Sequence, residues 1–513
     1  VENVDARVAE AGTAIETIKN GVEEYLAQRN IPESWFTGVS QIGTTTGLLG
    51  IELKFSNVGL ENMQSEMLEE IVRSIAVSED NLSSRLPAPI WHRLAGMAQM
   101  PTLAIGALAF DPNPPEGTTI LYAGTGTFSN ANEGGPALGV YKIVDDGNDT
   151  QVTLIGGDLL SSSNDRLDRQ VAKIIPIRRG LRTELLVATV SGKDGDNSAG
   201  GLFRSVGNLD TETRFVREGN GFPASRAVSD VARFEYPDGT GTKEVLWAGV
   251  PGDGIYRQVN TRSQAGGLTR GQWTKADTGV EGIKGSVAVK PFKTTFDSVS
   301  IRFAFDDVHK DVLYAGVIGS DSKLVSADAF TGRRDFTLRS LSRLDLSTNH
   351  DNQTWTPLDL PTSPGAPDPQ IPNSPVPDEG LHVGAQGLKN FSFLVDSTDR
   401  NHVFIGGDRH PLQIDGRLFE GTYNPADSTM DWQELVNQDA NGTAPHADSR
   451  SMVMLPAVGN VPLSLLQTDD GGIYRLLNPN DPATRRWQSV NGNLAITEIN
   501  SIAYDPVEDV IIA

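Results

Sequence analysis

The sequence predicts a mainly β protein, a seven-bladed β-propeller with a small N-terminal α+β segment. One strand-like phrase, Leu121-Tyr122-Ala123-Gly124, returns in related form about every 60 residues, at 185–188, 246–249, 313–316, 403–406, 463–466 and 510–513. About 60 residues accommodate four short strands and their turns, which make one propeller blade. The 53 Gly and 29 Pro supply the many turns that such a fold needs.

Each repeat contains further elements in the same order. A first strand ends in a turn such as Phe110-Asp111-Pro112, and the repeated phrase follows as the second strand. The third strand has a Gly-apolar-aromatic-basic pattern, as in Gly254-Ile255-Tyr256-Arg257. The last strand centres on a tryptophan, at 273, 355, 432 or 487. Alternating side chains in these strands are expected to pack against the blades on either side.

Residues 1–85 differ from the remainder of the chain. Apolar residues recur at helical spacing in 4–26 and 60–75 and alternate with polar ones in 49–55, which predicts two helices and a strand. Pro87 and Pro89 mark the boundary between this segment, 1–85, and a propeller at 86–513. Trp91 lies in a phrase like those that end the blades. We expect a strand near it to complete the last blade and close the ring.

Composition limits the partners that this chain can bind. The formal net charge is −23, and an acidic surface repels the phosphate backbone of nucleic acids. The same surface attracts cations, so calcium is the cofactor to expect if there is one. The sequence has no cysteine, which excludes disulfides and thiolate sites. No apolar stretch approaches the ~20 residues of a membrane-spanning helix.

The expected setting is extracellular or cell-surface. Acidic, turn-rich chains without cysteine are common among bacterial extracellular proteins. Val1 opens in a helical pattern and Ala513 stops within a strand phrase, so we expect a monomer or a segment of a longer chain.

The blade pattern resembles a known class of propellers. Asp-Pro, Leu-Tyr-Ala-Gly, Gly-Ile-Tyr-Arg and a final Trp, in this order, are similar to the bacterial neuraminidase repeat, or Asp-box, class, which includes sialidases, sortilin-like domains and two-aspartate xyloglucanases. The Asp-box turns are degenerate, with Val144-Asp145-Asp146-Gly147-Asn148 as the nearest match. Residues 446–450, 469–475 and 487–494 resemble a blade of very large secreted bacterial proteins of cyanobacterial type, which often carry calcium-binding repeats. The resemblance implies the fold and leaves the activity open.

An enzymatic interpretation has few candidate residues. A sialidase needs three clamping arginines, and no such triad is evident. The resemblance to xyloglucanases implies an inverting mechanism with two opposed carboxylates. Asp469 or Asp470 is a candidate for one of them. The first-blade turn has no carboxylate before Glu133, which is the remaining candidate for the other.

Polar residues at strand ends are candidates for ligand binding. Asp408, Arg409 and His410 directly follow a strand that is expected to be inner, where propeller loops face the central channel. Asp253 occupies the equivalent place in the third blade.

A second group of polar residues lies in the C-terminal blade. His446, Asp448 and Arg450, together with Asp469 and Asp470, are expected near the mouth of one blade. They could hold a divalent cation or a sugar hydroxyl. The alternative is structural, with Asp448 and Asp470 capping turns and Arg450 paired with one of them.

The candidate metal ligands are Asp194, Asp196 and Asp469. Asp194 and Asp196 lie in an oxygen-rich loop that resembles a calcium loop but lacks the final Glu of an EF-hand. The alternative for this loop is a solvated turn.

Three functions remain open on the sequence. The leading hypothesis is a non-catalytic extracellular module that binds glycan or protein through its propeller loops. The second is an inverting glycoside hydrolase that acts on a polysaccharide. The third is a scaffold within a giant adhesin, without a ligand of its own.

Overall fold

The computed structural model describes residues 36–43, 49–55, 91, 100, 104–126, 137–155, 169–191, 200–209, 212–239, 241–263, 266–289, 292–305, 308, 310–321, 336–365, 378–411, 415–457, 462–494, 503–505 and 510–512. The chain divides into two compact units, Val1–Pro89 and Ile90–Ala513. In the first unit, β1 (Phe36–Gly43) and β2 (Leu49–Phe55) pair antiparallel. The strand predicted at 49–55 is therefore confirmed, whereas the two predicted helices lie outside the described residues.

The second unit is built from antiparallel sheets that follow one another along the chain. Blade 1 consists of β3 (Ile105–Phe110), β4 (Thr119–Thr125), β5 (Val140–Asp145) and β6 (Thr150–Leu154). Blade 2 consists of β7 (Arg169–Arg179), β8 (Arg182–Ser191), β9 (Gly200–Asn208) and β10 (Glu212–Arg217). Blade 3 consists of β11 (Asp230–Asp238), β12 (Gly241–Val250), β13 (Gly254–Ser263), β14 (Leu268–Thr269) and β15 (Thr274–Lys275).

Blades 4 to 6 continue this arrangement. Blade 4 consists of β16 (Lys284–Val289), β17 (Phe292–Phe305), β18 (Val312–Asp321), β19 (Phe336–Asp345) and β20 (Thr356–Leu358). Blade 5 consists of β23 (Ser392–Asp396), β24 (Asp399–Arg409), β25 (Gly416–Asn424) and β26 (Thr429–Glu434). Blade 6 consists of β27 (Ser451–Leu455), β28 (Ser464–Asp469), β29 (Gly472–Leu477) and β30 (Arg486–Ser489). A C-terminal sheet is described through two strands, β31 (Ala503–Asp505) and β32 (Val510–Ile512).

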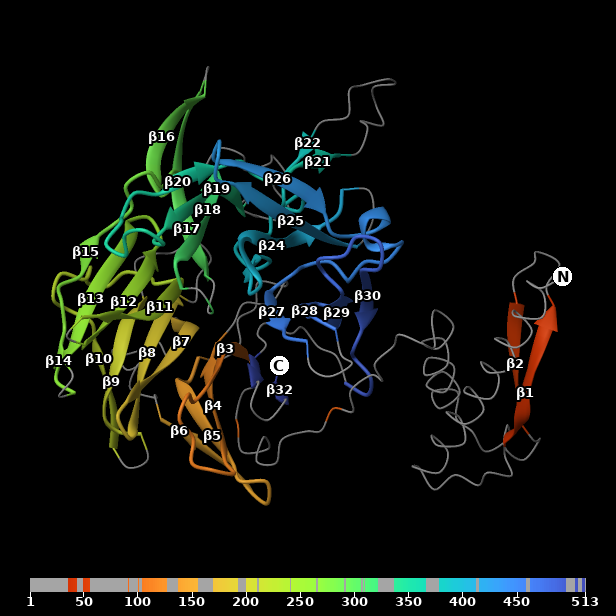
Figure 1. The fold of residues 1–513 in the computed structure, drawn as a ribbon, viewed down its shortest axis with the longest axis horizontal. Helices are drawn as coiled ribbons and strands as arrows, with labels where there is room; N and C mark the ends of the chain where they lie inside the picture. Colours follow the sequence, from red (N-terminus) through yellow and green to blue (C-terminus); the bar gives the residue numbers. More distant parts are fainter. Residues whose placement is uncertain are drawn as a thin grey trace, which may run out of the picture. The chain divides into compact units, whose positions relative to one another are not determined.

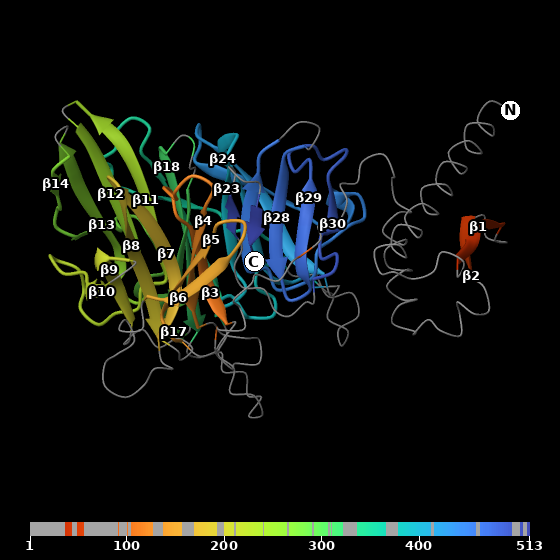
Figure 2. The ribbon, with the colours of Figure 1, turned by 90° about the horizontal axis from the view of Figure 1, so that it is seen from below.

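The sheets close into a ring through one strand from each. β3, β7, β11, β17, β23, β27 and β31 contact one another in this order, and β31 also contacts β3. Figure 1 shows the sheets succeeding one another around a centre, with the C-terminal strands beside β3. Figure 2 shows the same sheets from a perpendicular direction. This arrangement is a mainly β propeller, in which the sheets pack face to face around an axis.

The repeated phrase lies in the strand that follows the ring-forming strand of each sheet, which is the second strand except in blade 4, where β16 and β17 precede β18. Burial on both faces explains its composition. In β12, Leu246 and Ala248 pack in the core shared with blade 2, whereas Val245 and Trp247 pack in the core shared with blade 4. All four side chains are buried. A strand enclosed on both faces needs apolar residues at successive positions, because neither face is solvated.

The predicted tryptophans connect neighbouring blades. The indole N–H of three of them donates to a main-chain carbonyl of the preceding blade: Trp355 to Ala276 (2.8 Å), Trp432 to Asp359 (2.9 Å) and Trp487 to Leu435 (2.7 Å). Each acceptor lies three or four positions after the preceding blade's own tryptophan. Each indole N–H thus gains an acceptor while its rings fill the core between sheets.

Residues 361–380, between blades 4 and 5, are rich in proline, and β21 (Ser363–Pro364) and β22 (Asp378–Glu379) of this segment pair with each other. The buried Arg417 donates to the carbonyls of Gly380 and Glu379, both at 2.6 Å, and so ties β22 to blade 5. In the described residues, no helix is long and apolar enough to cross a membrane.

Candidate functional site

Polar side chains gather at one edge of blades 5 and 6. This edge carries the end of each second strand and the start of each first strand, because the strands alternate in direction. β24 ends and β28 ends there, and β23 and β27 begin there. The residues that meet at this edge are called the blade 5–6 seam: Asn390, Asp408, Asp448, Arg450, Gln467, Asp469 and Asp470.

Two aspartates of the seam share a hydrogen bond. Asp448 is linked to Asp470 through their carboxyl groups, and Asn390 donates to Asp448 Oδ1 at 2.7 Å. Arg450 donates to Asp470 Oδ1 at 2.9 Å. Burial, followed by the charge of Asp470, raises the pKa of Asp448 to about 7. Near neutral pH this carboxyl group therefore exists in both forms, and it can donate or accept a hydrogen bond.

Asp469 lies deeper in the same seam. It is fully buried, and its Oδ1 accepts the N–H of Gly471 at 2.8 Å. Its Oδ2 and both polar atoms of the buried Gln467 amide form no hydrogen bond of ordinary geometry among the described residues, although Gln467 and the backbone of Gly472 lie close enough to favour the ionised form of Asp469. Burial raises the pKa of Asp469 to about 8. Buried polar atoms without partners destabilise a fold unless a water molecule or ligand satisfies them.

The orientation of Gln467 and Asp469 follows from the alternation of β28. Leu465 lies two positions before Gln467 and packs with Phe404 and Leu418 of blade 5. Residues two apart on a strand point to the same side, so Gln467 and Asp469 also face blade 5. The unpartnered atoms are thus directed into the space between the two blades.

Asp408 has a bracing role at this edge. It is fully buried, Oδ1 accepts the N–H of Arg409 at 2.7 Å, and Oδ2 accepts the N–H of Gln386 at 3.1 Å. Its carbonyl accepts the N–H of Asp448 at 2.8 Å, which ties blade 5 to blade 6. Asp408 is itself the second-last residue of β24, which is second in its sheet, and β23 is the strand that contacts the neighbouring blades. The expectation that an inner strand precedes Asp408 is therefore corrected.

The other predicted ligand-binding residues lie around this group or away from it. His446 is exposed at the entrance to blade 6. His410 is buried with Nε2 3.7 Å from Glu434, and burial lowers the pKa of His410. Asp253 lies in a turn of blade 3, where its carboxylate accepts the hydroxyl of Tyr256 at 3.2 Å. The structure thus brings the residues of 446–470 together with Asp408 but places Asp253 elsewhere.

Several candidates cannot be placed. Glu133, Asp194 and Asp196 lie outside the described residues. Among the residues that are described, no group of three or more His, Asp or Glu side chains is arranged to hold a metal ion. Calcium binding stays a prediction.

Sequence reasoning missed Asn390, Gln467 and His382. His382 is buried behind the seam, where Nδ1 accepts the N–H of Leu338 at 3.0 Å and Nε2 is 2.8 Å from the carbonyl of Asn390. Gln467 had little signal in the sequence, because Ser464, Thr468 and Asp469 of the same strand are polar too. Asn390 had none, because its partner Asp448 is 58 positions away and the contact depends on how the blades pack.

Comparisons with known proteins give no family. No protein-family model and no curated protein matches this chain. Similar solved structures include a subtype N11 neuraminidase-like protein of A/flat-faced bat/Peru (9% identity, 75% of this chain, 92% of that chain, TM-score 0.29), a GH43 β-1,3-galactosidase (11%, 77%, 75%, 0.29) and the Synechocystis apocarotenoid oxygenase (11%, 88%, 83%, 0.30). These TM-scores are too low to support an argument about function. The fold is established by the sheet order and contacts of this chain.

Proposed function

We propose that this chain is a non-catalytic extracellular module that recognises glycan or protein through propeller loops, with the blade 5–6 seam as its binding site. The observation that supports this most is that the seam has partly exposed carboxyl groups in front of buried polar atoms. Asp448 and Asp470 are partly exposed, and behind them lie the buried, unpartnered Oδ2 of Asp469 and amide of Gln467. Sugar hydroxyls both donate and accept, as do water molecules that bridge them to buried groups.

The strain at Asp448 also supports a functional role. Its φ is 75°, in the left-handed region that side-chain-bearing residues rarely adopt. Backbone strain of this kind persists where the surrounding structure enforces it, and it is frequent at functional sites. Here the N–H of Asp448 is held by Asp408, and its carboxyl group is held by Asn390 and Asp470.

The hydrolase alternative is less well supported by this geometry. Inverting glycosidases separate their two carboxyl groups by about 6.5–9.5 Å, to leave room for a water molecule. Asp448 and Asp470 are in direct hydrogen-bond contact, and Arg450 pairs with Asp470. Asp469 is fully buried, so its carboxyl group is not exposed to a bound polysaccharide. Glu133, the other candidate, lies outside the described residues.

A glycan array, probed with and without calcium, tests the proposal. The wild-type chain is expected to bind at least one glycan, and Asp448→Asn and Asp470→Asn are expected to weaken that binding by about tenfold. Asp431→Asn is the matched control, because Asp431 is an exposed aspartate on β26 of blade 5. It is expected to bind like the wild type.

Other outcomes separate the alternatives. Binding that is unaffected by the Asp448 and Asp470 substitutions would remove the seam from the site. Release of reducing sugar from a bound polysaccharide would favour the hydrolase. A chain that binds no glycan and captures no protein in either condition would favour the scaffold.

A further inference from the structure

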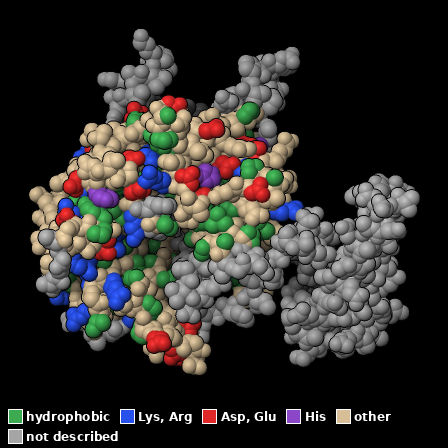
Figure 3. Space-filling model, in the orientation of Figure 1, with side chains coloured by type: hydrophobic (Ala, Val, Ile, Leu, Met, Phe, Trp, Pro, Cys, Tyr) green, Lys and Arg blue, Asp and Glu red, His purple; other side chains and the backbone are tan. Residues whose placement is uncertain are grey.

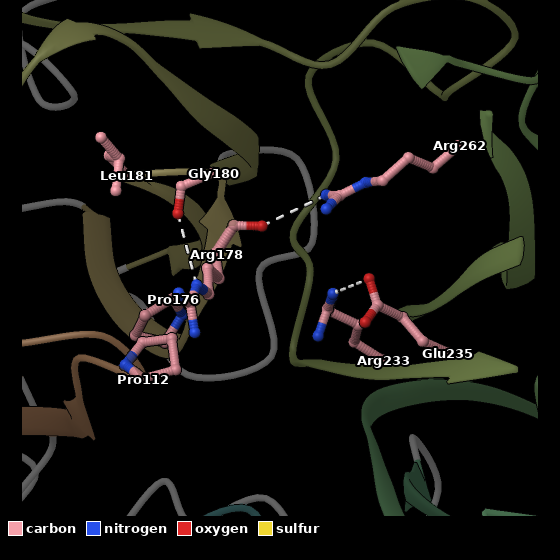
Figure 4. Close-up of a pocket in the computed structure, with 8 residues that line it drawn as sticks. All are labelled: Pro112, Pro176, Arg178, Gly180, Leu181, Arg233, Glu235 and Arg262. Carbon is pink, nitrogen blue, oxygen red and sulfur yellow. Dashed lines mark hydrogen bonds and ion pairs between the residues drawn. The ribbon is translucent and has the colours of Figure 1, made fainter. Parts of the chain in front are cut away.

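A pocket of about 520 Å³ lies at the opposite edge of the blades, between blades 2 and 3 (Figure 4). β7 and β13 both end at this edge, and the turn between β7 and β8 forms one wall. The charged side chains that line the pocket are Arg178, Arg233, Arg262 and Glu235. Three guanidinium groups and one carboxylate thus surround one cavity, in a chain whose net charge is −23.

Main-chain carbonyls hold two of these guanidinium groups in place. Arg178 Nε donates to the carbonyl of Gly180 at 3.3 Å, and Arg262 Nη2 donates to the carbonyl of Arg178 at 3.2 Å. Among the described residues neither Arg178 nor Arg262 forms an ion pair. A carbonyl orients a guanidinium without neutralising it, so both positive charges remain available to a ligand.

The third arginine is anchored to the floor of the pocket. Arg233 pairs with Glu235 beside it and with Glu244 at 2.8 Å. Glu244 also accepts from Arg179 at 2.8 Å and from Asn260 at 2.9 Å, and its side chain is buried. This network fixes the floor, while the one carboxylate that lines the pocket is already engaged by Arg233.

Apolar groups complete the wall. Pro112 and Pro176 line the pocket, and Leu181 at its rim is 94% exposed. Figure 4 shows the three guanidinium groups around a common space, with Leu181 and the prolines to one side. On the face drawn in Figure 3, Lys and Arg side chains gather over the region of blades 2 and 3.

We infer that this pocket binds an oxyanion carried on a sugar ring, either the carboxylate of a uronic acid or a sulfate ester. The planar guanidinium fork matches both groups and can donate two parallel hydrogen bonds to either. The apolar face of a sugar ring fits against Leu181 and the proline rings. The pocket and the blade 5–6 seam lie at opposite edges, so this inference stands independently of the function proposed for the seam.

Calorimetric titration of the full chain with three oligosaccharides tests the inference. The probes are a galacturonate oligomer, a sulfated oligomer and a neutral oligomer of similar length. Binding of one acidic probe is expected, and whichever binds identifies the source of the oxyanion. Arg178→Gln and Arg262→Gln are each expected to weaken that binding about tenfold. Inorganic sulfate should compete with the sulfated probe, and acetate with the uronate.

The control is Arg214→Gln, which removes an exposed arginine from β10 of blade 2 with the same change in net charge. It is expected to leave binding unchanged. Three results would overturn the inference: equal binding of the neutral oligomer, equal losses in the Arg214 and Arg262 variants, or no binding of either acidic probe. Asp448→Asn, measured on the same acidic probe, should have no effect here, so failure at the seam and failure at this pocket are distinguishable.

Discussion

The indole N–H of Trp91 donates a 2.9 Å hydrogen bond to the carbonyl oxygen of Val490, which lies 399 positions later in the chain. Val490 comes three positions after Trp487, and Trp487 in turn donates to Leu435, three positions after Trp432. Trp91 therefore repeats the contact that links successive blades. We propose that the segment around Trp91 completes the last blade, as its phrase predicts.

Removing the indole is expected to weaken this closure. Asn493 brackets Trp91, because Oδ1 accepts its N–H at 2.6 Å and Nδ2 donates to its carbonyl at 2.9 Å. Trp91 also packs against the core formed by Leu455, Leu466 and Ile473. We expect Trp91→Ala to lower the free energy of unfolding by about 2–3 kcal/mol. Urea unfolding measures it. Trp91→Phe, which keeps a ring but no donor, should cost about 1 kcal/mol; an unchanged midpoint in both variants would argue against closure.

The stability of the propeller should fall in alkaline solution because of His402. Its ring lies 3.0 Å from Asp396 and 3.1 Å from Glu420, and Arg485 also pairs with Glu420. Burial opposes the charge of His402, but hydrogen bonds to the two carboxylates outweigh it and raise the pKa to about 9. Because the pKa of His402 is higher in the folded state than in the unfolded chain, protonation of this ring stabilises the fold. The stabilisation is complete below the pKa of an unfolded histidine, about 6.5, and is lost as pH rises through 9.

Urea unfolding at pH 6, 8 and 10 measures this effect. The wild type should lose up to roughly 3 kcal/mol between the extremes, and His402→Gln should lose much less. Parallel pH profiles in the two proteins would show that His402 is not responsible.

Acid stability should depend on Glu244. Burial alone would raise the pKa of Glu244, but Arg179 and Arg233 outweigh it and lower the pKa to about 2. A lowered folded-state pKa gives stability that is present above about pH 4.5 and lost as pH falls through 2. We expect Glu244→Gln to cost about 3–5 kcal/mol at pH 7, because two arginines lose a buried partner. Acid unfolding monitored by circular dichroism measures this. The exposed Glu116→Gln is the control, and an equal loss there would refute the assignment.

Replacing Asp469 should stabilise the protein in alkaline solution. Burial raises the pKa of Asp469 to about 8, so the folded state must keep this carboxyl protonated at pH values where the unfolded chain is already ionised. The resulting loss of stability grows between about pH 4 and pH 8 and is constant above pH 8. Asparagine has the same shape, stays neutral and can donate to Gln467. We expect Asp469→Asn to raise the free energy of unfolding more at pH 8 than at pH 5, by roughly 2–4 kcal/mol. Calorimetric melting at both pH values measures the difference; an equal effect at pH 5 and pH 8 would contradict it.

The sequence by itself determined the blade order. Each second strand must be apolar at successive positions because both of its faces are enclosed, and this leaves a periodic signal that is visible at Leu246-Trp247-Ala248. The same local logic identified the tryptophans of the last strands and the carboxylates at 446–470, because turn residues stand next to the strands that they follow.

The tertiary structure alone decided which of these residues meet. Asn390 contacts Asp448 across the seam between two blades, and Arg262 reaches Arg178 over 84 positions of chain. Both contacts depend on the angle and register at which separate sheets pack. Hydrophobic periodicity constrains what each sheet buries, but it contains no information on which polar residues at the sheet edges lie opposite each other.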